Sequence, residues 1–341
     1  MNNLQNKNQF LIDHKRFKIQ KLITNNKKYF DFFNNYAKNH YTLIKNHCLC
    51  GVKDDLDISH YDRYSVQFNT VICKNCGLVR ASDYYKTENI SDFYQNHYRE
   101  IMSNDEAYLA PGIFFEKQVK DSITKFNLIK NESNVDLNNL KILDLGGGAG
   151  GVLHHFKNTK ELYLADYYDP YLDYAKTKGI NVIKGGLNNI TFKPDIVILS
   201  HVIEHWNDFE TEIKNLIKIQ KLNQTINYIE FPGIDSLKLG RRQGDFLDDI
   251  HIPHVYYFTS YVFENLMNRH GFKKLYINSN IESLFIYTGI KKDPINNFSK
   301  VRNDLIQAER VRKICLIKKF IKKFIPKKIL EIKKTILNNF S

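Results

Sequence analysis

Residues 141–151 read KILDLGGGAGG, an apolar run followed by six positions of which five are glycine. The run at 141–145 has the length and composition of a buried strand, and the glycines predict a tight turn that opens a helix. Glycine is needed where a nucleoside-bearing ligand presses against the backbone, because a Cβ would block its approach. The stretch therefore predicts a nucleoside-binding turn, although such a turn alone does not exclude a dinucleotide-binding loop.

Around this turn, short β-rich apolar runs alternate with amphipathic helical segments, which is typical of a parallel sheet covered by helices. Residues 259–272 predict a helix with Thr259 or Ser260 as N-cap and Gly271 as its stop. The other predicted strands are LYLAD (162–166), INVIK (180–184), DIVILSHV (195–202), TINYIEF (225–231), KKLYIN (273–278) and SLFIYTGI (283–290).

Two carboxylates stand where a nucleoside ligand would need them. Asp144 precedes the glycines and can receive an ammonium group, directly or through water. Asp166 ends the next predicted strand, where it can accept both hydroxyls of a ribose. Asp169 and Pro170 then fit an N-cap followed by an N1 proline, so the next helix is expected to begin there.

A cluster of polar residues ends the strand predicted at 195–202. Ser200 and His201 come first, and Glu204 and His205 follow one turn later. In open sheets of this kind, ligands bind at the carboxyl edge of the parallel strands. These side chains are therefore expected beside the glycine turn.

This ordered set resembles the class I S-adenosylmethionine-dependent methyltransferases over about residues 135–290, and the final "HGF" strand pair separates it from dinucleotide dehydrogenases. The resemblance implies an α/β fold with a Rossmann-like, mostly parallel sheet and an antiparallel final strand. Many relatives carry an acid near the adenine where this chain has Asn188, so that contact stays open. The implied cofactor-binding residues are Asp144, Gly146, Gly148, Gly150, Asp166, Ser200 and His201.

Four cysteines form two close pairs, Cys48 with Cys50 and Cys73 with Cys76, and a glycine follows each pair. Four soft ligands in two such turns suit a tetrahedral, structural Zn²⁺ site with no open position. If the first turn kept the usual two-residue spacing, His47 would replace Cys48 as a ligand; we favour Cys48. Buried cysteines without metal are the alternative.

A zinc-binding turn ending in CGLV (76–79) before such a domain resembles sugar methyltransferases of deoxysugar and surface-polysaccharide pathways. In those proteins the zinc module helps to close the substrate cleft. The resemblance implies a nucleotide-sugar or surface-polysaccharide acceptor, with His254 matching the family's base and His205 a second active-site histidine. His251 and Pro253 stand where the family has Tyr and Glu, which favours O-methylation over C-methylation.

The histidine candidates also follow from the chemistry. Methyl transfer from a sulfonium usually requires removal of a proton from the nucleophile, and histidine has a pKa suited to that task. His205, His251 and His254 are therefore the candidate catalytic residues, with a structural role in the core as the alternative. In the preceding loop, Arg241 and Arg242 are candidates to pair with a phosphate of the acceptor, or are simply solvated.

The net charge of +13 is concentrated in the C-terminal tail: residues 310–341 contain eleven Lys or Arg and one acid. A general nucleic-acid surface is therefore not expected. The sequence contains no apolar run long enough to span a bilayer and no signal peptide, so a cytoplasmic protein is expected, with its cysteines reduced.

The tail pairs apolar residues at helical spacing with lysine doublets, and Pro326 is expected to divide it. Such a basic amphipathic helix suits peripheral contact with the inner face of an anionic membrane; packing on the protein's own body is the alternative. A non-carbohydrate metabolite or lipid acceptor, and a non-enzymatic module that binds RNA or a partner, stay open as other functions. The expected organisation is a helical extension (1–46), a zinc-binding module (47–80), a helical linker (81–136), the methyltransferase-like domain (137–292) and the basic tail (293–341).

Overall fold

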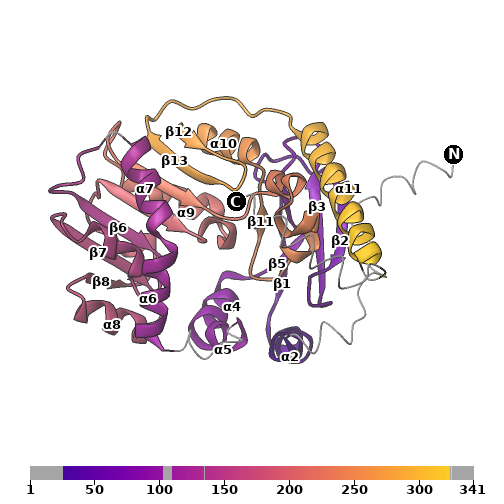
Figure 1. The fold of residues 1–341 in the computed structure, drawn as a ribbon, viewed down its shortest axis with the longest axis horizontal. Helices are drawn as coiled ribbons and strands as arrows, with labels where there is room; N and C mark the ends of the chain where they lie inside the picture. Colours follow the sequence, from indigo (N-terminus) through magenta and orange to yellow (C-terminus); the bar gives the residue numbers. More distant parts are fainter. Residues whose placement is uncertain (1–25, 103–109, 134, 323, 325–341) are drawn as a thin grey trace.

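The computed structural model describes residues 26–102, 110–133, 135–322 and 324 (Figure 1). Its largest sheet has seven strands in the order β12-β13-β10-β9-β6-β7-β8, of which β10 to β8 run parallel and β13 and β12 are antiparallel to their neighbours. The predicted α/β fold with an antiparallel end is thereby confirmed. The strands are β6 (Lys141–Leu145), β7 (Glu161–Asp166), β8 (Asn181–Lys184), β9 (Ile196–Ser200), β10 (Ile226–Glu230), β12 (Phe272–Ile277) and β13 (Glu282–Tyr287).

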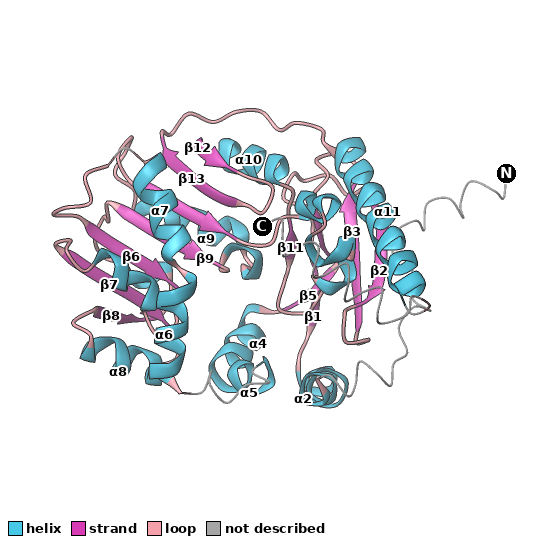
Figure 2. Ribbon diagram, in the orientation of Figure 1, coloured by secondary structure: helices cyan, strands magenta, loops and turns pink. Residues whose placement is uncertain are grey.

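Helices cover both faces of this sheet (Figure 2). Neighbouring residues of β6 point to opposite faces, so Ile142 joins one apolar cluster and Leu143 the other. The first cluster includes buried residues of α6 (Pro111–Asp121), α7 (Ile123–Glu132) and α8 (Asp169–Thr177). The second includes those of α9 (Phe209–Lys218) and α10 (Ser260–Arg269).

The starts of two helices test the capping predictions. Thr259 is the N-cap of α10, because its side chain accepts a hydrogen bond from the Val262 N–H. The prediction for α8 was wrong by one residue: Tyr168 is the N-cap, and Asp169 is the first helical residue. There the Asp169 carboxylate still faces the positive end of the helix dipole. After the glycine turn the chain forms a 3-10 helix, η5 (Gly151–Phe156).

A second, antiparallel sheet lies beside the first in the order β11-β4-β3-β2. Its strands are β2 (Asp55–Tyr61), β3 (Gln67–Cys73), β4 (Val79–Ala81) and β11 (Tyr256–Tyr257). The cysteine segment contributes buried Phe68 and Ile72 to the same apolar cluster as Leu143 of the large sheet. Because β11 comes from the chain after β10, the two sheets are joined through the segment that carries the candidate histidines.

Short helices lie below the two sheets in Figure 1, where α2, α4 and α5 are labelled, and one small strand pair lies beside the second sheet. They are α2 (Lys27–Asp31), π-helix η2 (Phe32–Ala37), α3 (Lys38–His40), α4 (Thr87–Asp92), π-helix η3 (Phe93–His97) and α5 (Tyr98–Met102), with β1 (Leu43–Lys45) antiparallel to β5 (Asp83–Tyr85). The helices expected in the N-terminal extension are present from residue 27, and residues 1–25 lie outside the described part of the chain.

The long helix α11 (Phe298–Lys322) follows the methyltransferase-like region. Its first turns bury Val301, Leu305 and Ala308, and it packs on the 3-10 helices η8 (Ile234–Leu239) and η9 (Arg241–Gly244). Farther along, its apolar side chains are exposed, and Pro326 lies outside the described residues. Within the described ranges, no helix combines the length and apolar character needed to cross a membrane.

Candidate active site and cysteine centre

The glycine turn after β6 has the backbone that the sequence predicted. Gly146, Gly148 and Gly150 have φ of +66°, +60° and +85°, where glycine is favoured because it has no Cβ. A Cβ on Gly147 would lie 2.3 Å from Oδ2 of Asp144. The turn therefore presents bare backbone over the Asp144 carboxyl group.

A residue that the sequence did not single out holds this turn in place. Gln118 of α6 donates from Nε2 to the Gly147 carbonyl at 2.8 Å. Its Oε1 accepts from the Ala149 and Gly151 N–H groups at 3.1 and 3.3 Å. No spacing or motif marked Gln118, because it lies on a separate helix about 30 positions earlier in the chain.

Asp144 is fully buried, and within the described part of the chain neither of its carboxylate oxygens has a hydrogen-bond partner. Burial raises the pKa of Asp144 to about 7, an effect that nearby Lys125 opposes. An acid kept in this state is ready to accept a cationic donor such as an ammonium group. The orphaned carboxyl under a glycine turn fits the methionine end of S-adenosylmethionine.

Asp166, at the end of β7, is also buried but is fully engaged. Its Oδ2 accepts from the Gly148 N–H at 2.9 Å, and its Oδ1 accepts from the N–H groups of Tyr167 and Tyr168 at 2.8 and 3.0 Å. These bonds fix the carboxylate beside the glycine turn, where the ribose of the same ligand was expected.

Ser200 ends β9 and belongs to a buried network. Its Oγ donates to Oε1 of Glu230 at 2.6 Å and accepts from Nζ of Lys125 at 2.8 Å. Lys125 also pairs directly with Glu230, and Tyr228 donates to the other oxygen of that carboxylate. Burial lowers the pKa of Lys125 to about 8. Glu230 could have been noticed as a lone acid at the end of an apolar strand, whereas no sequence signal marked Lys125.

His201 follows Ser200 and faces solvent, with 56% of its side chain exposed. Its φ is +56°, a strained value for a residue with a Cβ, and its Nδ1 lies 3.2 Å from Oε1 of buried Glu204. His201 also lines a cleft of about 530 Å³ at the carboxyl edge of the sheet. The other lining residues are Glu230, Phe231, Pro232, Ser236, Leu239, Arg241, Arg242, Ser279, Asn280 and Glu282.

The three candidate catalytic histidines lie together. The ring centroids of His205 and His254 are 4.7 Å apart, and those of His254 and His251 are 3.8 Å apart. The Val255 N–H donates to the Glu204 carbonyl at 2.8 Å, which fastens the 251–255 segment to the 3-10 helix η7 (Ile203–His205).

The histidines share an environment that favours the uncharged imidazole. Burial lowers the pKa of His205, and it lowers those of His251 and His254 well below the usual range, with Arg63 acting in the same direction on the latter two. Tyr94, from the helical region expected to link the domains, places its hydroxyl 2.8 Å from Nδ1 of His205. Sequence reasoning missed Tyr94, because nothing in its spacing relates it to the histidines.

Residues 113–277 match the family model described as a methyltransferase domain. The matched residues include the glycine turn, both cofactor-site acids and all three histidines. Residues 113–277 therefore form a methyltransferase domain, and its glycine turn and two acids fit S-adenosylmethionine as the donor.

Solved structures of methyltransferases are similar to the chain. One is magnesium protoporphyrin IX methyltransferase from Synechocystis with bound S-adenosylhomocysteine, at 15% identity and a TM-score of 0.40, covering 59% of this chain and 98% of the other. Another is an S-adenosylmethionine-dependent methyltransferase from Mesorhizobium loti, at 12% identity and a TM-score of 0.39, covering 49% and 97%. A search of the curated proteins found no match.

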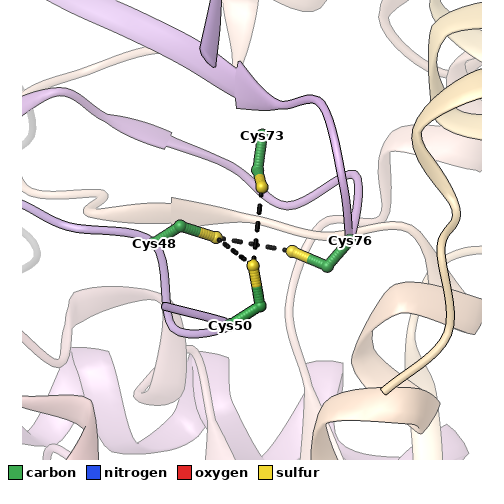
Figure 3. Close-up of side chains that lie close together, drawn as sticks. All are labelled: Cys48, Cys50, Cys73 and Cys76. Carbon is green, nitrogen blue, oxygen red and sulfur yellow. Dashed lines mark hydrogen bonds between the residues drawn. The ribbon is translucent and has the colours of Figure 1, made fainter. Parts of the chain in front are cut away.

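The four cysteines outside the methyltransferase domain converge as Figure 3 shows. The Sγ atoms of Cys48 and Cys76 are 3.4 Å apart, those of Cys48 and Cys50 are 3.5 Å apart, and those of Cys50 and Cys73 are 3.6 Å apart. A tetrahedron of Zn–S bonds of about 2.3 Å requires sulfur atoms about 3.8 Å apart, so the donor set fits Zn²⁺. His47 is exposed and outside this group, which favours Cys48 as the ligand.

The cysteine turns contact two helices at the edge of the methyltransferase domain. The Leu49 carbonyl accepts from both terminal nitrogens of Arg269 in α10 at 3.2 Å. The Asn75 carbonyl accepts from the N–H groups of Asn297 and Phe298, at the start of α11, at 3.2 and 3.3 Å. The cysteine centre is thus connected to α11. This helix packs on η8 and η9, which supply part of the cleft lining.

The guanidinium of Arg241 is engaged in hydrogen bonds within the protein and is not free for a phosphate of the acceptor. Its guanidinium pairs with Asp249 through two nitrogens and donates to the Gly233 carbonyl and the Ser236 hydroxyl. Arg242 is half exposed, and its Nε lies 3.7 Å from Oδ1 of Asp249. Of the two arginines predicted to meet a phosphate, Arg242 therefore keeps more of its surface toward the cleft.

Proposed function

We propose that the methyltransferase transfers a methyl group to a hydroxyl of a carbohydrate, either a nucleotide-sugar or a surface-polysaccharide precursor. The observation that carries this proposal is the polar cleft beside the cofactor-site residues. Hydroxyl, amide, carboxylate and guanidinium groups line it, and such groups recognise a polyhydroxyl ligand better than an apolar one. Phe231, Pro232 and Leu239 in the same lining offer apolar surface to the face of a sugar ring.

The residues divide the work as follows. Asp144 and the glycine turn would hold the methionine part of S-adenosylmethionine, and Asp166 the ribose. S-adenosylmethionine supplies a sulfonium methyl group to a nucleophile when bound. The acceptor hydroxyl gives its proton to an uncharged imidazole, for which His254 and His205 are the proposed bases. The acceptor oxygen gains the methyl group, and the electron pair of the broken carbon–sulfur bond stays on sulfur.

The cysteine centre is proposed to bind a structural Zn²⁺. All four thiols converge, no fifth donor joins them among the described residues, and none of the four lines the cleft. Through Arg269 and Asn297, zinc would stabilise the contact between the second sheet and the helices of the methyltransferase domain. Its role is therefore support of the cleft, not chemistry in it.

The exposed residues of the tail support a second part of the proposal, which is peripheral contact with an anionic membrane. Ile314, Ile317, Ile321 and Phe324 are each at least half exposed and recur at helical spacing on α11 and just past its end. Lysines occur between them, at Lys318 and Lys319. Exposed apolar residues interleaved with cations suit a surface of anionic lipid, where late glycan precursors are found.

The test is methyl transfer from radiolabelled S-adenosylmethionine to two acceptor pools, soluble nucleotide-sugars and membrane-extracted glycolipids. Label in either pool that falls at least 100-fold in His254→Ala supports the proposal, and the labelled pool identifies the stage of synthesis. His40→Ala is the matched control, because His40 is exposed and its ring packs on Tyr36, which is not a site residue. Label in neither pool, with transfer to apolar metabolites instead, would overturn the carbohydrate acceptor.

A further inference from the structure

We propose that Glu204, His205 and His254 bind a divalent transition-metal ion beside His201, a residue of the cleft lining. One ligand atom from each of these residues lies within 4.8 Å of the other two. His205 Nε2 is 3.8 Å from Oε1 of Glu204, close to the roughly 3.4 Å that separates two ligands around a tetrahedral ion with bonds of about 2.1 Å. This centre is separate from the four cysteines.

The backbone fixes the two segments that supply these ligands. The Val255 N–H donates to the Glu204 carbonyl at 2.8 Å, and the His254 N–H donates to the His251 carbonyl at 2.9 Å. Residues about 50 positions apart are therefore held in register, and the His254 ring is placed against the His205 ring. A site that must keep its geometry without metal requires this kind of support.

The hydrogen bonding of His205 selects the tautomer that a metal needs. Its Nδ1 lies 2.8 Å from the Pro253 carbonyl, which can only accept, and 2.8 Å from the Tyr94 hydroxyl, which can donate or accept; a proton on Nδ1 satisfies both partners. The lone pair is then on Nε2, the nitrogen that faces Glu204. A ligating histidine characteristically donates its other ring N–H to a backbone carbonyl, which orients the ring and raises its basicity.

Glu204 supplies the second reason for a cation. It is 1% exposed, and its Oε2 has no hydrogen-bond partner within the described ranges. Its Oε1 faces Nδ1 of His201 at 3.2 Å, which leaves the other oxygen of a buried carboxylate uncompensated. A buried carboxylate left in this state is costly, and a metal ion in front of it would remove that cost.

The position suits a role in the proposed methyl transfer. His201 connects the cluster to the cleft, because its ring lines the cleft and contacts Glu204. The cluster thus adjoins a residue of the cleft in which the acceptor is proposed to bind.

Two imidazoles and one carboxylate are the ligand set of catalytic Zn²⁺ and of non-haem Fe²⁺ sites, both of which leave coordination positions open. Such an ion would bind the acceptor hydroxyl and lower its pKa, so that its proton is lost to solvent at neutral pH. This role rests on the proposed function, whereas occupancy of the site does not. If the ion is bound, His205 and His254 act as its ligands, and ionisation of the metal-bound hydroxyl replaces the proton transfer to imidazole that is proposed for the metal-free site.

The experiment uses the full chain, dialysed against a chelator until only the cysteine-bound zinc is retained, and then titrated with Co²⁺. The expected result is one equivalent of cobalt with visible d–d bands and without the near-ultraviolet charge transfer that thiolate ligands give. Glu204→Gln and His254→Ala should each weaken this binding at least 100-fold. His40→Ala, altered at an exposed histidine, should bind as the unmodified protein does.

Circular dichroism and zinc content show whether each variant is folded. His205→Asn replaces any variant that does not fold. Absence of cobalt bands in the unmodified protein, or equal affinity in Glu204→Gln, would overturn the proposal. Cobalt binding without transfer to any carbohydrate supports the metal site and overturns the acceptor instead. Full methyl transfer by chelated protein that binds no cobalt overturns the metal site and leaves the acceptor standing.

Discussion

The described part of the chain has two clusters of side chains that could hold a metal ion, and they differ in almost every respect. Cys48, Cys50, Cys73 and Cys76 come from two short turns and supply four identical soft ligands. The other cluster, Glu204, His205 and His254, mixes carboxylate and imidazole and is completed only when distant segments meet. The first has a full tetrahedral set and can support the fold, whereas the second has three ligands and leaves room for a substrate.

The surroundings of the two clusters follow the same division. The cysteine turns are bonded to their neighbours through backbone groups, such as the Leu49 carbonyl with Arg269. In the described part of the chain, Oε2 of Glu204 and Nδ1 of His251, whose ring lies against that of His254, lack hydrogen-bond partners. Satisfied polar groups indicate a structural centre, and unsatisfied buried ones indicate a place where a ligand acts.

The largest effect is expected for Cys73→Ser, which tests whether the cysteine cluster is a structural metal site. Structural zinc contributes roughly 10–16 kcal/mol in small zinc-binding folds, which is comparable to the whole stability of most domains, roughly 5–15 kcal/mol. We therefore expect loss of zinc and of cooperative thermal unfolding. Zinc content and differential scanning calorimetry measure both.

The matched control for this change is Cys315→Ser, because Cys315 lies on α11 outside the cluster and is not buried. It should keep the zinc content and the melting temperature of the unmodified protein. A folded Cys73→Ser protein with full methyltransferase activity would show that the four thiols are only a packed group, and the contrast between the two clusters would fail.

The second prediction concerns the methyl donor, which should depend on neither metal centre. Asp144→Asn removes the only anionic partner proposed for the ammonium group while changing the volume very little. Binding of S-adenosylmethionine, followed by isothermal titration calorimetry, should weaken at least 100-fold with the zinc content unchanged. Unchanged affinity would show that the orphaned carboxyl serves another ligand.

The same carboxyl predicts a pH dependence. Burial raises the pKa of Asp144 from an unfolded value of about 3.9 to about 7, so the folded protein binds the proton more tightly. Its contribution to stability is complete below the lower pKa and is lost as the pH rises through 7. Without cofactor, Asp144→Asn should therefore unfold at a higher temperature than the unmodified protein at pH 8 and not at pH 4. Cofactor affinity should rise between about pH 5.5 and 7.5 as the carboxyl ionises.

Features that depend on local spacing could be predicted from the sequence, as the cysteine cluster was. Features that form only when distant segments meet could not. Local signals identified the glycine turn with Asp144, the strands of the large sheet and the cysteine pairs, because spacing alone determines them. The second sheet was missed, since β11 is contributed by residues 256–257 and pairs with β4 from 79–81. Gln118 and Lys125 were missed for the same reason, as each meets its partners only after α6 and α7 pack on the sheet.

Substitutions of the glycines in the cysteine turns should have a smaller effect on stability, and they test whether these turns support the fold. Gly51 and Gly77 follow the second cysteine of each pair, with φ of +81° and +78°. A Cβ on Gly51 would meet nothing within 4 Å, whereas a Cβ on Gly77 would lie 2.8 Å from Val301 of α11. Gly51→Ala should therefore cost about 1–2 kcal/mol, the conformational term alone.

Gly77→Ala should cost about 2–5 kcal/mol, because overpacking against α11 is added to the same conformational term. Chemical denaturation of the two zinc-loaded variants measures the difference between them. If the two glycines cost the same, the cysteine turn does not hold α11, and the cluster supports only its own sheet.

The smallest effect on the fold is expected where neither cluster reaches, in the exposed part of α11. Lys318→Gln with Lys319→Gln should change the free energy of unfolding by less than about 0.5 kcal/mol, since both side chains are exposed. Each basic residue near an anionic surface contributes about 1 kcal/mol, so binding to phosphatidylserine vesicles should weaken roughly 10–30-fold. Sedimentation with anionic and zwitterionic vesicles measures the change. Equal binding by the variant and the unmodified protein would assign this helix face to packing against protein, and the tail would then belong with the cysteine cluster as part of the supporting structure.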